Sequence, residues 1–340
     1  MKLTKITLPA AGLLLAMGMP VQAGVIFNFN YTDAAGVGFN DAAVGTDRQN
    51  ALQGAGDYLS GFLTGYDASI FLDVDGSVSG GGTLAAAGSN YNGPISTGFG
   101  NQGDVMMKIL GGDAADPNVG AADGSVTWNF TDFQWELGND FQAGEFDFFS
   151  TAVHELLHAL GFASDIGQNG EDPVPGDPAG NWSPFDNFVA DSTGELIDDI
   201  SFALATGRWN TASVAGGGCG AGLLFTGPNA MAANGGSAAE IYSANPWENG
   251  SSGSHLDDQC YNGTYMMEAA TDAGLGIRQI SALEIGIMQD IGYTQFGVTS
   301  QPPGGQVPAP PVIFLLAGGL MLLGWSRKNS RWNFMGKRVS

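Results

Sequence analysis

The sequence predicts an α+β fold of two lobes, and three observations predict it. A helical pattern near residue 50 is followed by several short segments typical of strands. A strongly apolar helical pattern occupies the middle of the chain, and a loop-rich stretch after it ends in a third helical pattern. This order favours a small sheet packed beside a helix, followed by a looser second half.

The first lobe begins with a helix over residues 46–63, where apolar side chains recur at intervals of three and four residues: Ala51, Ala55, Leu59 and Phe62. Short strands are predicted after it, because apolar and polar residues alternate or turn residues follow. They cover residues 68–74, 105–110, 126–130 and 133–137. These segments together predict a small sheet.

The central helix is predicted over residues 147–160 and has the most apolar helical pattern in the chain. Gly161 follows it, at the position where a left-handed residue commonly ends a helix. Residues 167–181 and 216–253 are rich in turn-forming residues, which predicts loops. Helical spacing returns at residues 281–291 and predicts a closing helix.

The N-terminal residues 1–23 are predicted to be a secretory signal peptide. Two lysines precede an apolar run, and the segment ends in the small-residue sequence Val21-Gln22-Ala23. The apolar run is too short to anchor the chain across a bilayer. We therefore expect an exported protein whose folded domain covers residues 24–298.

The C-terminal end has a separate organisation. Residues 299–311 form a Pro- and Gly-rich linker, and residues 312–340 contain an apolar stretch followed by a basic tail. This layout resembles the PEP-CTERM sorting tags of Gram-negative bacteria, although Val307-Pro308-Ala309-Pro310-Pro311 stands in place of Pro-Glu-Pro. The resemblance implies membrane contact before the tag is processed, and a location outside the cell or on its surface. The alternative is that the apolar stretch and its basic tail are retained and anchor the protein at the membrane.

Between these ends the chain is strongly acidic. Residues 24–298 contain all 34 acidic residues of the chain but only four basic ones, which are Arg48, Lys108, Arg208 and Arg278. Nucleic acid is therefore excluded as a partner, because phosphate contacts need clusters of Lys and Arg.

The segment Asp73-Val74-Asp75-Gly76 is similar to part of a calcium loop. It lacks the remaining ligand spacing of such a loop. A solvated turn is the simpler interpretation, and Ca²⁺ stays an alternative.

The chain has two cysteines, Cys219 and Cys260, both in its loop-rich half. An even number of cysteines in an exported protein predicts a disulfide. Two buried thiols are the alternative.

The segment His154-Glu155-Leu156-Leu157-His158 lies on the predicted central helix. Two histidines four residues apart project from one face of a helix, so both imidazoles can bind one zinc ion. The glutamate between them can accept a proton from the attacking water. The chain has three histidines in all, and we expect His255 to be the third ligand, because catalytic zinc sites use three protein ligands and a water.

The motif His-Glu-x-x-His-x-x-Gly at residues 154–161 resembles that of the metzincin peptidases. The later run that contains His255, Met266-Met267 and residues 281–293 is similar to the C-terminal part of leishmanolysin-like metzincins, in which a long insertion precedes a distant third histidine. The similarity covers roughly residues 46–295. It implies a turn methionine beneath the zinc, with Met267 as first candidate, Met266 as second, and ordinary core packing as the alternative for each.

Two other residues are alternatives for the third zinc ligand. Position 164, where a compact metzincin has its third histidine, is Ser, and Asp165 follows it. A gluzincin would use a downstream glutamate such as Glu240.

The resemblance implies a two-lobed, metzincin-like zinc endopeptidase with a small twisted sheet, in which Glu155 is the general base. It also implies that a protein or peptide substrate binds extended along an edge strand before the central helix, for which residues 126–137 are the candidate. A noncatalytic surface or adhesion protein of metzincin fold and a zinc hydrolase of a non-peptide substrate are the competing hypotheses.

Overall fold

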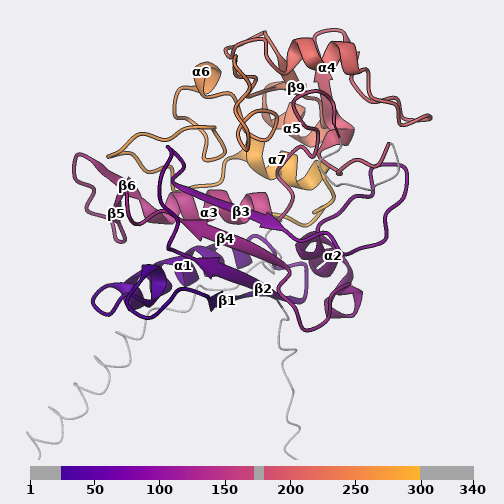
Figure 1. Ribbon diagram of the computed structural model, residues 1–340. Helices are drawn as coiled ribbons and strands as arrows, with labels where there is room; N and C mark the ends of the chain where they lie inside the picture. Colours follow the sequence, from indigo (N-terminus) through magenta and orange to yellow (C-terminus); the bar gives the residue numbers. More distant parts are fainter. Residues whose placement is uncertain (1–23, 172–179, 299–340) are drawn as a thin grey trace, which may run out of the picture. The chain divides into compact units, whose positions relative to one another are not determined.

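The computed structural model describes residues 24–171 and 180–298 (Figure 1). The predicted signal peptide, the linker at residues 299–311 and the segment 312–340 lie outside the described residues. The described chain combines helices with several small sheets, which confirms the predicted α+β class. Within the described ranges, no helix is both long and apolar enough to cross a membrane.

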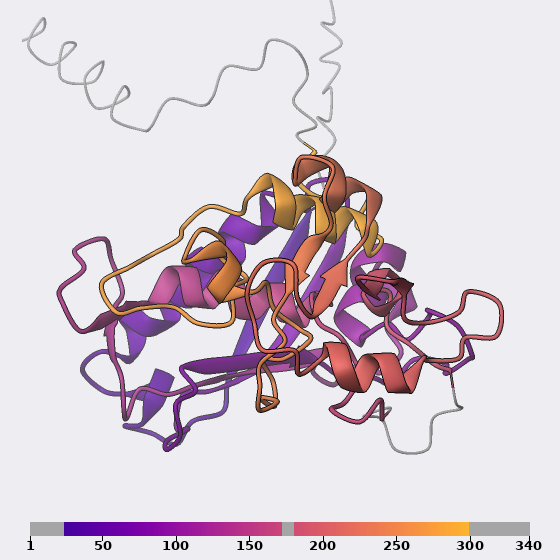
Figure 2. The ribbon, with the colours of Figure 1, turned by 90° about the horizontal axis from the view of Figure 1, so that it is seen from above.

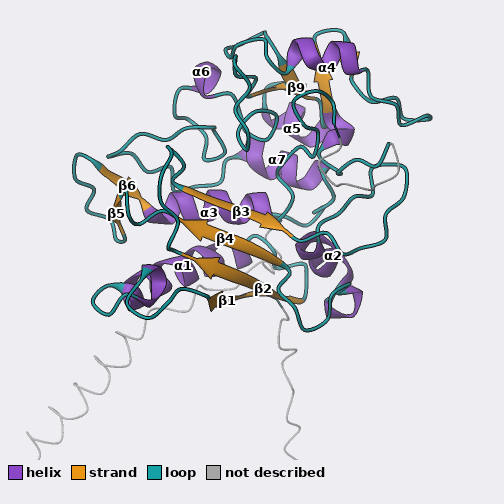
Figure 3. Ribbon diagram, in the orientation of Figure 1, coloured by secondary structure: helices purple, strands orange, loops and turns teal. Residues whose placement is uncertain are grey.

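A four-stranded sheet forms the core of the N-terminal half (Figure 3). Its strands, in spatial order, are β1 (Val25–Tyr31), β2 (Ala68–Asp75), β4 (Gly124–Trp128) and β3 (Ala85–Ser89). The first three run parallel, and β3 is antiparallel to β4 at the edge. β2 confirms the strand predicted at residues 68–74, and every second side chain from Ala68 to Val74 is buried.

Two helices cover the buried face of this sheet. α1 (Gly45–Ser60) packs against β1, and α3 (Phe148–Ala159) packs against α1, β3 and β4. Leu52 and Leu59 of α1 are fully buried, as are Val153 and Leu156 of α3. The amphipathic patterns at residues 46–63 and 147–160 therefore predicted both helices correctly.

The predicted strand at residues 105–110 is wrong, because this segment is helical. It belongs to α2 (Asp104–Gly111), in which Val105, Met106 and Ile109 are buried. These three positions share one face of a helix, whereas a strand would have turned Met106 to the face opposite Val105. A six-residue apolar run is too short for its pattern to distinguish the two structures.

The edge of the sheet also differs from the prediction. Residues 126–137 were the candidate for an edge strand that binds substrate. Residues 126–128 belong to β4, which lies between β2 and β3 and has no free edge. Further along this segment, β5 (Gln134–Glu136) pairs separately with β6 (Glu145–Asp147). The edge strand beside α3 is β3. Its sequence of Ala, Gly and Ser has low strand propensity, which is why the pattern did not predict it.

The C-terminal half contains a second, antiparallel sheet and short helices. Its strands, in spatial order, are β10 (Ala239–Ile241), β9 (Leu223–Phe225), β7 (Val189–Asp191) and β8 (Gly194–Glu195). The helices are α4 (Thr206–Ala212), α5 (Pro228–Ala233), α6 (Asp258–Tyr261) and α7 (Ala282–Asp290), and α7 packs against α5. Figure 2 shows these segments, in red and orange, lying over the sheet of the N-terminal half.

Two links connect distant parts of this architecture. The predicted disulfide between Cys219 and Cys260 is confirmed and joins the loop before β9 to α6. Just beyond α7, the buried hydroxyl of Tyr293 donates a hydrogen bond of 2.8 Å to the carbonyl of Leu160, at the end of α3. The predicted closing helix is therefore present and is tied to the helix that carries the histidine pair.

Candidate metal centre

Both ends of α3 are fixed by their neighbours. Asp147 caps the first turn by accepting a hydrogen bond from the Phe149 amide, and Arg278 donates to both of its carboxylate oxygens at 2.8 and 2.6 Å. At the other end, Gly161 has φ of +103°, the left-handed region that the sequence predicted for this position. The directions of the side chains between these ends are thereby set.

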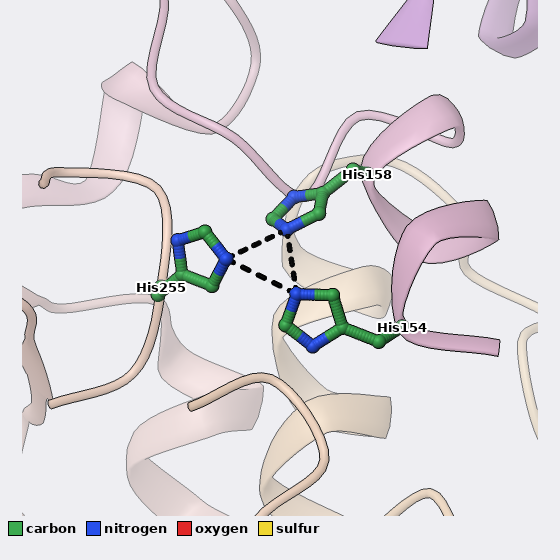
Figure 4. A group of neighbouring side chains, drawn as sticks. All are labelled: His154, His158 and His255. Atoms are coloured by element: carbon green, nitrogen blue, oxygen red, sulfur yellow. Dashed lines mark hydrogen bonds between the residues drawn. The ribbon is translucent and has the colours of Figure 1, made fainter. Parts of the chain in front are cut away.

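The three histidines of the chain lie together (Figure 4). His154 and His158 project from α3, and His255 approaches from a loop 97 residues beyond His158. Their Nε2 atoms form a triangle with sides of 3.0, 2.9 and 3.1 Å. The structure therefore brings together all three predicted ligands.

Backbone carbonyls determine which nitrogen of each ring carries the proton. The Nδ1 atoms of His154, His158 and His255 lie 2.6, 2.7 and 2.9 Å from the carbonyl oxygens of Met266, Phe162 and Ser251, respectively. A carbonyl can only accept a hydrogen bond, so each neutral imidazole holds its proton on Nδ1. All three Nε2 lone pairs then point toward one another, an arrangement that a cation between them would stabilise.

The surroundings also favour neutral rings. Desolvation lowers the pKa of His154 to about 4 and that of His255 to about 3, and it lowers the pKa of His158 as well. Repulsion between neighbouring imidazoles adds to the effect at His158 and His255. Neutral imidazole is the form that binds metals.

This donor set fits a zinc ion. Nitrogens about 3 Å apart can all lie at the usual Zn–N distance of about 2.0–2.1 Å from one ion beside their common plane. Three imidazole ligands leave a fourth coordination position for water, and carbonyls bonded to the distal ring nitrogens are the usual support for metal-binding histidines. Among the described residues, these histidines form the one group that could hold a metal ion.

Glu155 lies between the two helical ligands and is buried, with 7% of its surface exposed. Burial raises the pKa of its carboxyl group to about 8, and a hydrogen bond from the backbone of Ala87 opposes the rise. Ala87 belongs to the edge strand β3. The site therefore contains a carboxyl group with high proton affinity next to the sheet edge.

Met266 and Met267 are both buried beside the histidines. The carbonyl of Met266 accepts the hydrogen bond from His154, and that of Met267 accepts one of 2.8 Å from the amide of Leu256, the residue after His255. Both candidates for the turn methionine thus belong to one segment that contacts the site through its backbone.

The two alternative third ligands do not belong to the site. Asp165 accepts hydrogen bonds from the Tyr91 hydroxyl and the Asn101 amide, and Glu240 accepts one from the Gly220 amide. Neither is part of the histidine group. The third member of that group is His255.

The segment considered for calcium forms local hydrogen bonds. Asp73 accepts one from the Asn30 side chain, and Asp75 accepts two from Ser77. A turn stabilised by its own side chains accounts for this segment.

Two contributors to the site were not predicted from the sequence. Ala87 contributes only its backbone, so no side-chain pattern could reveal it. Glu284 on α7 accepts a hydrogen bond from the Met267 amide. It had a local signal, because Ser281 and Glu284 form a capping box with the spacing Ser-x-x-Glu.

Comparison with known proteins adds no assignment. No protein-family model matches the chain, and no curated protein matches it significantly.

Proposed function

We propose that this protein is a zinc-dependent endopeptidase of the leishmanolysin-like metzincin type that acts after export. The observation that carries the proposal is the convergence of three Nε2 lone pairs beside a buried glutamate on the same helix. Three histidines and a glutamate are the residue types that a hydrolytic zinc site requires.

His154, His158 and His255 would hold the ion. When bound, zinc supplies a Lewis acid that polarises a carbonyl and makes water acidic near neutral pH. Glu155 accepts the proton from the attacking water and then donates it to the amine nitrogen as the peptide bond breaks. Burial raises the pKa of Glu155, which makes its carboxylate a stronger proton acceptor.

The position of β3 at the edge of the sheet supports a peptide substrate over a small molecule. An edge strand has backbone groups that an extended peptide can pair with, and α3 packs directly against this strand. Residues 85–89 carry only small side chains, so none of them is large enough to cover the strand's own backbone. This strand replaces residues 126–137 as the candidate for substrate binding.

The decisive experiment compares Glu155→Gln with the wild type, and Glu195→Gln serves as the control because its side chain lies exposed on β8. Zinc content is measured by elemental analysis, and cleavage of casein and gelatin is followed with and without a chelator. We expect Glu155→Gln to retain zinc and to lose cleavage by about 100-fold or more, the usual effect of removing a general base. The control should keep both.

Other outcomes separate the competing hypotheses. Normal cleavage by Glu155→Gln would reject the assigned base. Wild-type protein that binds zinc but cleaves none of a broad set of proteins would favour an adhesion protein or a hydrolase of another substrate. Cleavage that survives complete removal of zinc would contradict the proposal altogether.

A further inference from the structure

The three ligands differ in how their rings are oriented. His158 and His255 bond to carbonyls only four residues away, at Phe162 and Ser251. His154 instead bonds to the carbonyl of Met266, 112 residues away in the sequence. The orientation of His154 therefore depends on whatever holds the Met266–Met267 segment.

This segment bonds to one ligand and to the residue that follows another. The Met266 carbonyl lies 2.6 Å from Nδ1 of His154, and the Met267 carbonyl accepts the hydrogen bond of the Leu256 amide, next to His255. A shift of the segment would consequently move one ligand ring and the backbone of another. Metal sites are sensitive to such shifts, because partners of the ligands set ring orientation.

Glu284 holds the segment from the other side. One carboxylate oxygen accepts the Met267 amide at 2.8 Å, and the other accepts the Ser281 amide at 2.7 Å. The side chain is fully buried at the first turn of α7. A bond from the Met266 backbone also reaches this carboxyl group. Glu284 thus connects the start of α7 to the Met267 amide, which belongs to the same peptide unit as the Met266 carbonyl that bonds to His154.

We propose that Glu284 is a positioning residue of the metal centre, which fixes the Met266–Met267 segment and through it the geometry of His154 and His255. The inference rests on the proposed zinc site and assigns Glu284 no contact with metal or substrate. A carboxylate is required because its partners are all donors: the backbone amides of Ser281, Met266 and Met267, and the Ser281 hydroxyl. A glutamine would present its own N–H₂ group to one of them and leave a buried donor unpaired.

The test uses Glu284→Gln in the full chain, and Ser281→Ala is the matched control. The control removes the Ser281 hydroxyl, which accepts the Glu284 amide and also bonds to the carboxylate, and so loosens the same helix cap. It leaves the Glu284 carboxylate and the amides of Ser281 and Met267 that bond to it in place. Both variants are titrated with zinc in competition with a chelator. Their cobalt-substituted forms are compared by visible absorption, which reports ligand geometry.

We expect Glu284→Gln to weaken zinc binding about 10-fold or more, in the range found for second-layer partners of metal ligands, and to change the cobalt spectrum. Ser281→Ala should melt at a lower temperature yet bind zinc like the wild type. Equal zinc affinities and identical cobalt spectra for the two variants and the wild type would overturn the inference. So would an equal loss of affinity in both variants, which would indicate general destabilisation.

A second variant covers poor folding of the first. Glu284→Asp keeps the charge but shortens the side chain by one methylene. We expect the same loss of zinc affinity and the same change in the cobalt spectrum. A zinc affinity and a cobalt spectrum equal to those of the wild type would count against the inference. Failure of the proposed function is distinguishable, because a wild-type protein that binds no zinc would refute the metal centre itself. Normal zinc binding in all variants would refute only the role of Glu284.

Discussion

Arg278 provides the sharpest test of how α3, the helix that carries His154 and His158, is held. Replacing it by methionine keeps much of its apolar stem but removes two hydrogen bonds to Asp147, at 2.8 and 2.6 Å. The Asp147 side chain is 1% exposed and caps α3. The substitution therefore leaves a carboxylate buried beside the helix start without its positive partner.

The structure sets the size of the effect. Removing one partner of a fully buried ion pair costs about 3–5 kcal/mol. Because 25% of the Arg278 side chain is exposed, we take the lower end, about 3 kcal/mol. At about 2–4 °C per kcal/mol for a domain somewhat smaller than this one, the melting temperature should fall by roughly 6–12 °C.

Arg208→Met is the matched control. Arg208 also bonds to a carboxylate, that of Asp191, but its side chain is 37% exposed. Exposed pairs contribute about 1 kcal/mol or less, so the expected fall is at most about 4 °C. Thermal unfolding of both variants is followed by circular dichroism in the presence of a chelator, so that metal affinity does not enter. An equal or smaller fall for Arg278→Met would refute the reasoning.

Three further predictions follow from the site and its supports. His255→Ala should lose bound zinc in elemental analysis whereas Asp165→Ala keeps it, and the reverse result would restore Asp165 as the third ligand. Reducing the disulfide, which joins residues 41 apart, should lower stability to chemical unfolding by about 2–4 kcal/mol, and an unchanged midpoint would show that it constrains little. The third prediction concerns pH. Hydrogen bonding to Arg208 holds the pKa of Asp191 below its usual value, so the folded state binds this proton more weakly than the unfolded state. The stabilisation is therefore fully present above the unfolded pKa of about 3.9 and is lost as pH falls below it. The stability difference between wild type and Arg208→Met in urea titrations should shrink between pH 5 and pH 2, and a constant difference would contradict this.

The helices that could be predicted are those long enough for their apolar spacing to show which face is buried. The apolar spacing of α1 and α3 extends over three turns or more, so its period is unambiguous. The same reasoning failed at residues 105–110, where α2 is only two turns long. In such a short run the packing partners, and not the local pattern, decide between helix and strand.

The strands of the sheet show a different limit. β3 consists of small residues with little preference for a strand, and it forms because β4 offers it a complete antiparallel ladder. β1 begins at Val25, directly after the predicted signal peptide, and pairs with β2 across more than forty residues. Pairing over such distances has no signature in either segment alone.

The candidate metal centre depends on both local and distant parts of the sequence. The helical pair follows from a spacing of four residues, and His158 and His255 each obtain their orienting carbonyl from four residues away. His154 alone depends on a carbonyl from a distant segment, which Glu284 holds at the start of α7. The ligand types could therefore be predicted by counting histidines. The convergence of their three Nε2 atoms could not be predicted, because it exists only after the C-terminal half has folded onto α3.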